Sequence, residues 1–149
     1  MTREEILSEI KTYFDAEELA CNHTLAKYGN QSWRFLDTMY LWCLLVIRKD
    51  ILRKPMYCNN HNVGTHQRGL RCNLCELVKS KSALYLTAHG FGKAGDFTVV
   101  GMAAEEARQK IKEFQHLLPC PIRMEAGVSW LHFDVMPNDK GVMVYEFTA

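Results

Sequence analysis

The sequence predicts an α+β fold in which helices come first and a small, mostly antiparallel sheet follows. Helical periodicity fills the first third of the chain, and strand-like stretches dominate the second half. One amphipathic helix over 103–118 lies between those stretches, where it can pack on the sheet. No linker or repeat divides the 149 residues. We therefore expect a single domain over 1–149, with a helical part over 1–55 and a sheet part over 56–149 that carries the site.

Two helices are expected in the helical part. Thr2 and Glu5 have the spacing of a capping box, in which each side chain bonds the other residue's backbone N–H, so the first helix begins there. A longer helix is expected over 32–52, because its apolar residues cover more than one face, as in a buried helix. Pro55 ends it, and the Asn-, Gly-, His- and Cys-rich segment 58–76 predicts an irregular loop.

The sheet part is expected to contain short strands, over 83–88, 97–100, 121–125, 128–135 and 142–147. Alternation in the fourth of them assigns two faces: Leu131, Phe133 and Val135 toward the core, and Trp130, His132 and Asp134 away from it. A tryptophan, a histidine and an aspartate on one face indicate the wall of a cleft rather than a solvated surface.

The composition is that of an ordinary globular protein. A hydrophobic content of 48% and a net charge of +1 do not fit a disordered chain or a protein that coats nucleic acid. The longest apolar run, 40–47, is too short to span a bilayer, and the acidic start from Met1 to Glu5 does not resemble a secretory signal. We therefore expect a monomer made in the cytoplasm, with no membrane insertion and with its six cysteines reduced.

Two histidines and an aspartate form a candidate metal site. His89 and Asp96 are seven residues apart and would point to opposite faces of a straight strand, but three glycines lie between them. We expect a strand, a tight turn and a second strand that bring both side chains to one place, with His132 as the third ligand. Two imidazole nitrogens and a carboxylate oxygen suit zinc. Three protein ligands leave a position open for water, as in catalytic zinc sites.

These residues have two other interpretations. The histidines could be separately hydrogen-bonded and Asp96 a turn residue, although the glycine spacing favours a metal site for the three together. The second alternative is a non-haem iron site, since His132-x-Asp134 matches the first two ligands of such sites. Those sites need a further histidine downstream, and His132 is the last histidine of the chain, which argues against iron.

Short segments around these residues resemble the signature of the hedgehog/DD-peptidase superfamily. This group contains the zinc D-Ala-D-Ala carboxypeptidases and many phage endolysin peptidase domains. The matching segments are Thr87-x-His89, Gly92-x-Ala94-x-Asp96 and Trp130-x-His132, with Gly69-Leu70-Arg71-Cys72 and Phe14-x-x-x-Glu18-Leu19 upstream. The resemblance covers about residues 14 to 136 and implies the hedgehog/DD-peptidase fold.

The resemblance also implies a role for each matched residue. It makes His89, Asp96 and His132 the ligands of one catalytic zinc ion. Arg71 corresponds to the arginine that steadies a carbonyl or carboxylate of the substrate. Thr87 and Trp130 lie in the matched segments, and we expect them to contact the substrate.

A peptidase of this kind also needs a carboxylate that takes a proton from water and delivers it to the leaving amine. Glu125 is the candidate, and Gly127 could form the bulge or hairpin that returns it to the site. The alternative for Glu125 is a solvent-exposed position at a strand end. Asp134 could instead orient a ligand histidine.

A second, structural zinc site is the other metal prediction. Cys58-x-x-His61 and Cys72-x-x-Cys75 have the spacing of a zinc knuckle. The alternative is an irregular loop with reduced thiols.

These expectations describe a zinc peptidase that hydrolyses peptide bonds of bacterial peptidoglycan, in the stem peptide or in a cross-link. The resemblance, together with the start of the chain, suggests a phage or prophage lysis protein that reaches the cell wall after a partner opens the membrane. D-Ala-D-Ala, L-Ala-D-Glu and cross-bridge bonds all stay open as substrates, as do carboxypeptidase and endopeptidase action. The alternative function is a non-catalytic, zinc-stabilised binding or structural module of the same fold.

Overall fold

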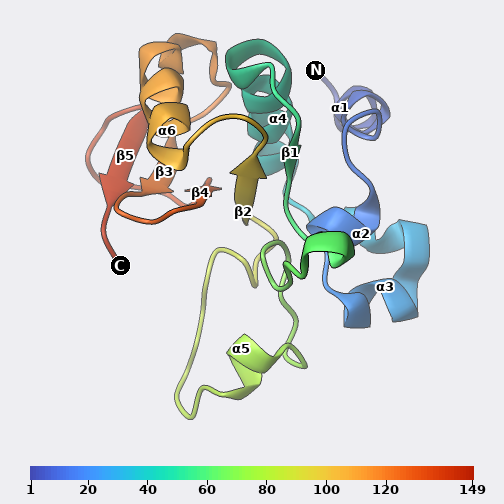
Figure 1. Cartoon of the computed structure of the whole chain (residues 1–149). Coiled ribbons are helices and arrows are strands. Elements are labelled where there is room, and N and C mark those ends of the chain that lie inside the picture. The colour runs from blue at the N-terminus through green and yellow to red at the C-terminus, as the bar shows by residue number, and fades with distance from the viewer.

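The computed structural model of the chain confirms an α+β fold and describes residues 1–149, the side chain of His61 excepted (Figure 1). The helical part contains α1 (Arg3–Ile10), α2 (Ala16–Leu19), α3 (Asn22–Tyr28), the 3-10 helix η1 (Gly29–Phe35), α4 (Thr38–Val46) and the π-helix η2 (Ile47–Leu52). The sheet part contains β1 (Met56–Tyr57), η3 (His61–Val63), α5 (Glu76–Lys79), β2 (Ala94–Val99), α6 (Ala104–Glu113), η4 (Gln115–Leu117), β3 (Ile122–Glu125), β4 (Leu131–Asp134) and β5 (Val144–Phe147).

The helical part follows the sequence expectation at its start and departs from it in the middle. α1 begins at the predicted capping box, with Thr2 and Glu5 bonded to each other's backbone N–H groups. The helix predicted over 32–52 begins later, because Asp37 caps α4 by accepting two N–H groups of its first turn. The residues before Asp37 form η1 instead, which ends at Phe35. The apolar spacing predicted the buried helix correctly, but the Asp37 cap decides the residue at which α4 begins.

The sheet has the strand order β1-β2-β4-β3-β5 within the described part of the chain. Its neighbouring strands are antiparallel except for β3 and β5, which pair in parallel. The prediction of a mostly antiparallel sheet is therefore confirmed, with one parallel pair. In the pairing of β2 with β4, Asp96 lies directly opposite His132. Directly opposed residues project from the same face, so this register brings two of the expected ligands together.

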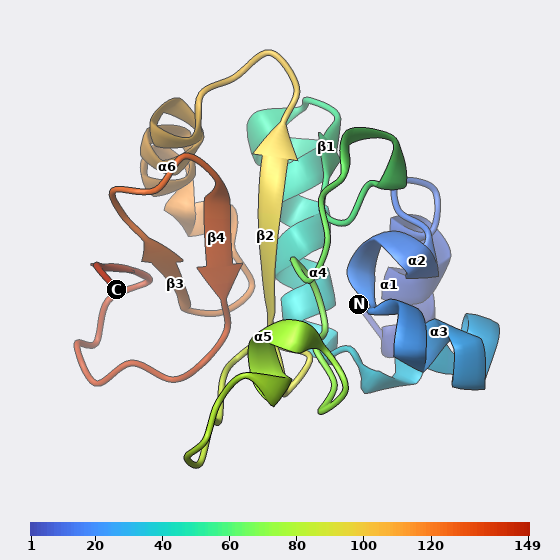
Figure 2. The same ribbon diagram turned by 60° about the horizontal axis from the view of Figure 1, so that its bottom comes forward.

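The hydrophobic core lies on the other face of these two strands. Leu131 and Phe133 on β4 are completely buried, as alternation predicts. The ring of Phe133 stacks on that of Phe97 with centroids 5.8 Å apart, and Tyr40 of α4 contacts it at 5.3 Å. α4 lies behind β2 in Figure 2. Burial of each large apolar side chain contributes roughly 1.5–3 kcal/mol, so packing on α4 fixes which face is left for Asp96 and its neighbours.

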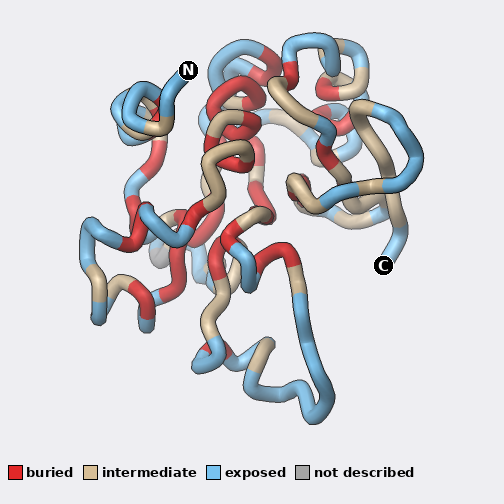
Figure 3. Tube along the Cα trace, turned by 180° about the vertical axis from the view of Figure 1, so that it is seen from behind, coloured by how far each residue is buried: buried red, intermediate tan, exposed pale blue. Residues whose placement is uncertain are grey.

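The strand predicted over 83–88 is not formed, which corrects the sequence expectation. Residues 83–87 have no regular structure, and Leu84 and Leu86 are 87% and 67% exposed. β2 already pairs with β1 on one edge and β4 on the other, so no edge is free for a further strand beside it. The segment instead belongs to an exposed loop that follows α5 and leads back toward β2 (Figure 3). None of the helices formed by the described residues has the length and apolar character needed to cross a bilayer.

Candidate metal centre

His89, Asp96 and His132 meet on the sheet face opposite α4. One potential ligand atom of each lies within 4.8 Å of the others, and all three side chains are buried. Asp96 comes from β2 and His132 from β4, while His89 lies in the turn that leads into β2. The structure therefore brings together the three residues that the sequence analysis selected.

The turn that carries His89 is held by its own backbone. The N–H of Phe91 donates to the carbonyl of Thr87 at 3.2 Å, and the N–H of Gly90 donates to the Thr87 hydroxyl at 3.2 Å. Of the three glycines expected to reverse the chain, Gly92 has a positive φ, of 69°. A Cβ there would lie 2.0 Å from the carbonyl oxygen of Phe35, so only glycine fits. Thr87 thus has a demonstrated place in the turn, and its contact with a substrate stays a prediction.

Asp96 is the charge at the centre of the group. Its carboxylate lies 2.7 Å from Nδ1 of His132 and 3.4 Å from Nε2 of His89, and the guanidinium of Arg71 approaches it at 3.4 Å. Burial alone would raise the pKa of Asp96, but the hydrogen bonds to His132 and His89 outweigh burial and hold the pKa well below its usual value. The group therefore keeps an anionic oxygen that can serve as a metal ligand.

Both histidines are oriented through the ring nitrogen that faces away from Asp96. Nδ1 of His89 lies 2.9 Å from the carbonyl oxygen of Gly69, and Nε2 of His132 lies 2.9 Å from Asp134. Such outer partners are typical of histidines that ligate zinc, because they fix the tautomer and aim the free nitrogen at the metal. With this donor set and no fourth protein ligand in the group among the described residues, the arrangement fits a zinc ion with an open position.

Asp134 is itself fixed, in agreement with the alternative that it orients a ligand histidine. It is fully buried and forms a bidentate ion pair with Arg123, with N···O distances of 2.8 and 3.0 Å. Burial opposes a charge on His132, but hydrogen bonds to Asp134 and Asp96 outweigh it and raise the pKa of His132 to about 9. In the metal-free protein the imidazole is therefore protonated near neutral pH.

Arg71 lies at the edge of the group. Its Nε donates to the carbonyl oxygen of Gln67 at 2.6 Å, which directs the guanidinium toward Asp96. It also lines a hollow of about 390 Å³ whose other walls include Leu70 and Phe91. A partly buried guanidinium between a metal centre and a hollow could bind an anionic or carbonyl oxygen.

Glu125 lies at the end of β3, on the strand next to His132. β3 and β4 pair with Arg123 opposite Asp134 and Met124 opposite Phe133, and one step beyond these pairs sets Glu125 across from His132. Gly127, with a φ of 78°, lies in the connection that reverses the chain, as expected. The Glu125 carboxylate is nevertheless not part of the ligand group among the described residues.

Trp130 precedes β4 and is half-buried. Its indole N–H is buried and has no acceptor in the described part of the structure. An unpaired buried donor is costly, by roughly 1–3 kcal/mol, so an acceptor supplied by a bound molecule would stabilise it. The contact of Trp130 with a substrate stays a prediction.

Sequence reasoning missed Arg108, which holds the connection between Glu125 and Trp130. This arginine of α6 is 3% exposed, and its guanidinium donates to the carbonyl oxygens of Val128 and Trp130 at 3.1 Å and of Glu125 at 3.4 Å. Glu105 balances its charge at 2.9 Å. Since α6 reads as an ordinary amphipathic helix, no local signal distinguishes Arg108 from a solvated arginine.

The prediction of a structural zinc site is right in bringing Cys72 and Cys75 together and wrong for Cys58. Cys72 and Cys75 do lie together, but their neighbours are Cys21 and His23. Cys58 is fully buried in the hydrophobic core, and the side chain of His61 lies outside the described part of the structure. The short spacing Cys21-x-His23 was the available signal.

Comparison of the chain with protein-family models, curated proteins and solved structures gave no match. The resemblance to the hedgehog/DD-peptidase superfamily therefore depends on the short sequence motifs.

Proposed function

We propose that the chain is a zinc peptidase that hydrolyses peptide bonds of bacterial peptidoglycan, with His89, Asp96 and His132 as the ligands of its catalytic zinc ion. One observation carries the proposal: three possible ligand atoms lie close together, and the second ring nitrogen of each histidine is hydrogen-bonded to an oxygen, of Gly69 for His89 and of Asp134 for His132. The choice of peptidoglycan follows from the motif resemblance, as does action at the cell wall of a bacterial host by a phage or prophage protein.

A zinc ion at this position would supply a Lewis acid that activates water and polarises a carbonyl group. The residues around it would do the remaining work. Arg71 can stabilise the negative charge that develops on the carbonyl oxygen, since its guanidinium already lies 3.4 Å from the Asp96 carboxylate. Trp130 can donate its unpaired indole N–H to a substrate carbonyl.

Glu125 would transfer the proton. In hydrolysis the water oxygen bonds to the carbonyl carbon, the C–N bond breaks, and one proton of the water passes to the leaving amine. The β3–β4 register supports this role, because its continuation leads from Arg123 opposite Asp134 to Glu125 beside His132. The products are a new carboxylate and a new amine.

A binding module without catalysis is the second candidate. It is favoured by the Glu125 side chain, because no hydrogen bond or ion pair with a described residue holds its carboxylate beside the three ligands; the bond between Glu125 and Arg108 is made by the backbone carbonyl of Glu125. Such a module would hold zinc through the same three ligands and bind peptide without cleaving it.

Purified peptidoglycan separates the two candidates. The zinc-loaded protein is incubated with the cell-wall material, new amines are quantified, and mass spectrometry identifies the termini and hence the bond that is cut. The peptidase requires amine release that a chelator abolishes and added zinc restores. The His116→Ala variant, which removes an exposed histidine outside both ligand groups, should behave as the wild type. No amine release from protein shown to carry zinc would overturn the peptidase and leave the binding module.

A further inference from the structure

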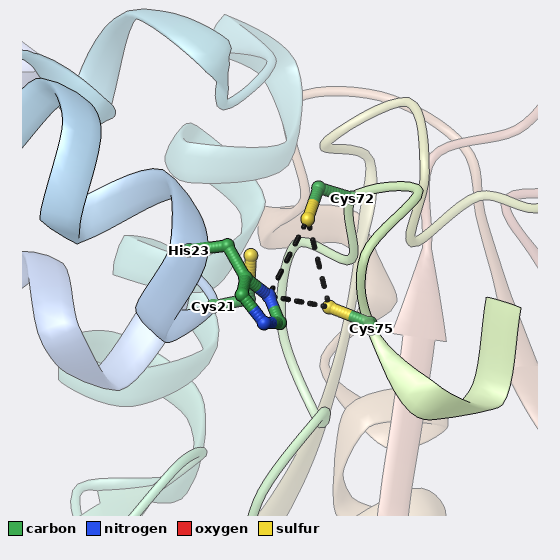
Figure 4. A group of neighbouring side chains, drawn as sticks. All are labelled: Cys21, His23, Cys72 and Cys75. Carbon is green, nitrogen blue, oxygen red and sulfur yellow. Dashed lines mark hydrogen bonds between the residues drawn. The ribbon is translucent and has the colours of Figure 1, made fainter. Parts of the chain in front are cut away.

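Four side chains that the proposed peptidase does not use gather between α3 and α5. Cys21 and His23 come from the start of α3, and Cys72 and Cys75 come from the turn before α5. Figure 4 shows the side chains pointing toward one another from these two parts of the chain. One potential ligand atom of each lies within 4.8 Å of all the others.

The distances within this group match the edges of a zinc tetrahedron. Zinc–sulfur bonds of about 2.3 Å and zinc–nitrogen bonds of about 2.0–2.1 Å place two sulfurs about 3.8 Å apart, and a sulfur and a nitrogen about 3.6 Å apart. Cys72 Sγ and Cys75 Sγ are 3.9 Å apart, and Nδ1 of His23 lies 3.5 and 3.8 Å from them. A single ion at the centre would therefore need little rearrangement of these three side chains.

The surroundings suit thiolates rather than thiols packed by chance. The backbone N–H of Leu74 donates to Cys72 Sγ at 3.3 Å, and the Thr24 hydroxyl lies 3.1 Å from Cys21 Sγ. Donors aimed at sulfur stabilise the anionic form that binds a metal. Cys21 and Cys75 are buried, Cys72 is partly exposed and His23 is exposed, so the group lies at the surface with two of its three cysteines covered.

We infer that Cys21, His23, Cys72 and Cys75 bind a structural zinc ion that fastens the segment 67–75 to the helical part. Four protein ligands with three sulfurs form a closed site, which fits a structural rather than a catalytic role. The inference does not depend on the proposed peptidase activity.

The segment that this zinc would fasten also supports the other group. Leu70 N–H donates to the carbonyl of Leu19 at 2.9 Å, and a Cβ at Gly69 would lie 2.3 Å from that same oxygen, so the two chains touch there. The carbonyl of Gly69 orients His89, and Arg71 directly precedes Cys72. A zinc ion at Cys72 therefore limits movement of the residues that hold His89 and approach Asp96.

The zinc content of the tag-free protein tests the inference. Native mass spectrometry should count two zinc ions per chain in the wild type and one in Cys75→Ser. Because His23 is exposed, His23→Ala should keep the fold yet lose the second zinc to a competing chelator that the wild type resists. Cys120→Ser is the matched control: Cys120 is partly exposed like Cys72 but contacts Cys43, and this variant should keep both ions.

Cobalt substitution tells the two sites apart. Thiolate ligands give cobalt(II) a charge-transfer absorption that a site with two histidines and one aspartate lacks. We expect this absorption in the wild type and in His132→Ala, and its loss in Cys75→Ser, whether or not any variant hydrolyses peptidoglycan. A wild type with no thiolate–cobalt absorption, a second ion that persists in Cys75→Ser, bound iron in place of zinc, or a Cys72–Cys75 disulfide in freshly isolated protein would each overturn the inference.

Discussion

The structure has two groups of possible metal ligands: His89, Asp96 and His132 (the His89 group), and Cys21, His23, Cys72 and Cys75 (the Cys21 group). They differ in their donor atoms and in the residues that hold those atoms in place. The His89 group has three ligands, sits on paired strands, and is backed by Gly69 and by the Arg123–Asp134 ion pair. The Cys21 group has four ligands, three of them sulfurs, on short elements near the surface. An open coordination position on a rigid sheet suits chemistry, whereas a closed tetrahedron between loops suits fastening.

Each group can be changed by substitutions that leave the residues of the other in place. The separate effects on activity and on zinc content then test whether the His89 group is catalytic and the Cys21 group structural. The segment 67–75 connects the two groups, because Arg71 contacts Asp96 of one group and Cys72 belongs to the other.

The largest expected effect follows the loss of one histidine. His132→Ala should reduce amine release from peptidoglycan to background, because both the metal and its orientation are lost. The zinc count should fall from two to one while the thiolate–cobalt absorption stays. Hydrolysis that persists in this variant would mean that the His89 group is not the catalytic site.

A smaller loss should follow Glu125→Gln. Removing a proton-transfer group lowers rates by roughly 100- to 10,000-fold, so the rate should fall within that range while both zinc ions and the melting temperature are kept. Glu113→Gln, on the exposed side of α6, is the matched control and should retain full activity. Unchanged kinetics in Glu125→Gln would move the proton transfer to another group.

Arg71→Ala should weaken transition-state binding by about 3 kcal/mol, on the scale of removing one oxyanion donor. The expected reading is a fall of about 100-fold in kcat/KM with the zinc count unchanged. Arg53→Ala, which changes an exposed arginine outside both groups, should leave kcat/KM as in the wild type. If Arg71→Ala instead costs a zinc ion, the arginine serves to hold the segment and not the substrate.

The smallest effect concerns the stability of the zinc-free protein. Its folded state raises the pKa of His132 from 6.5 to about 9, so the charged imidazole stabilises the fold fully below pH 6.5. That contribution, at most about 3 kcal/mol, is lost as pH rises through 9.

Urea unfolding at a series of pH values, with chelator present, would measure this loss. The free energy of unfolding should fall between about pH 6.5 and 9 in the wild type and change little there in His132→Gln. Equal slopes in the two proteins would show that His132 is not the titrating group.

Local spacing predicted the His89 group well because each ligand belongs to a short motif with an obvious constraint. Gly92 must reverse the chain next to Phe35, and alternation in β4 decides the face of His132. Those constraints act within a few residues, where sequence carries most of its information.

The failures have the opposite character. The pair Cys72 and Cys75 was recognised, but its partners were sought in the nearest segment and lie instead at Cys21 and His23, about 50 residues away. The strand expected over 83–88 has apolar alternation but no free edge to pair with. In both cases the missing information is which distant segments meet, and packing of α2 against Leu70 decides that only once the chain has folded.

The ligands of the two groups do not overlap along the chain. All four residues of the Cys21 group lie between 21 and 75, and all three of the other group lie between 89 and 132. Every ligand residue of the Cys21 group is therefore synthesised before the first ligand residue on the sheet side. A nascent chain that closes the 21–75 loop around an ion has already lost part of the chain entropy that opposes the later meeting of 67–71 with β2. If the inferred zinc ion binds at that stage, the metal supply during synthesis would affect the yield of folded protein.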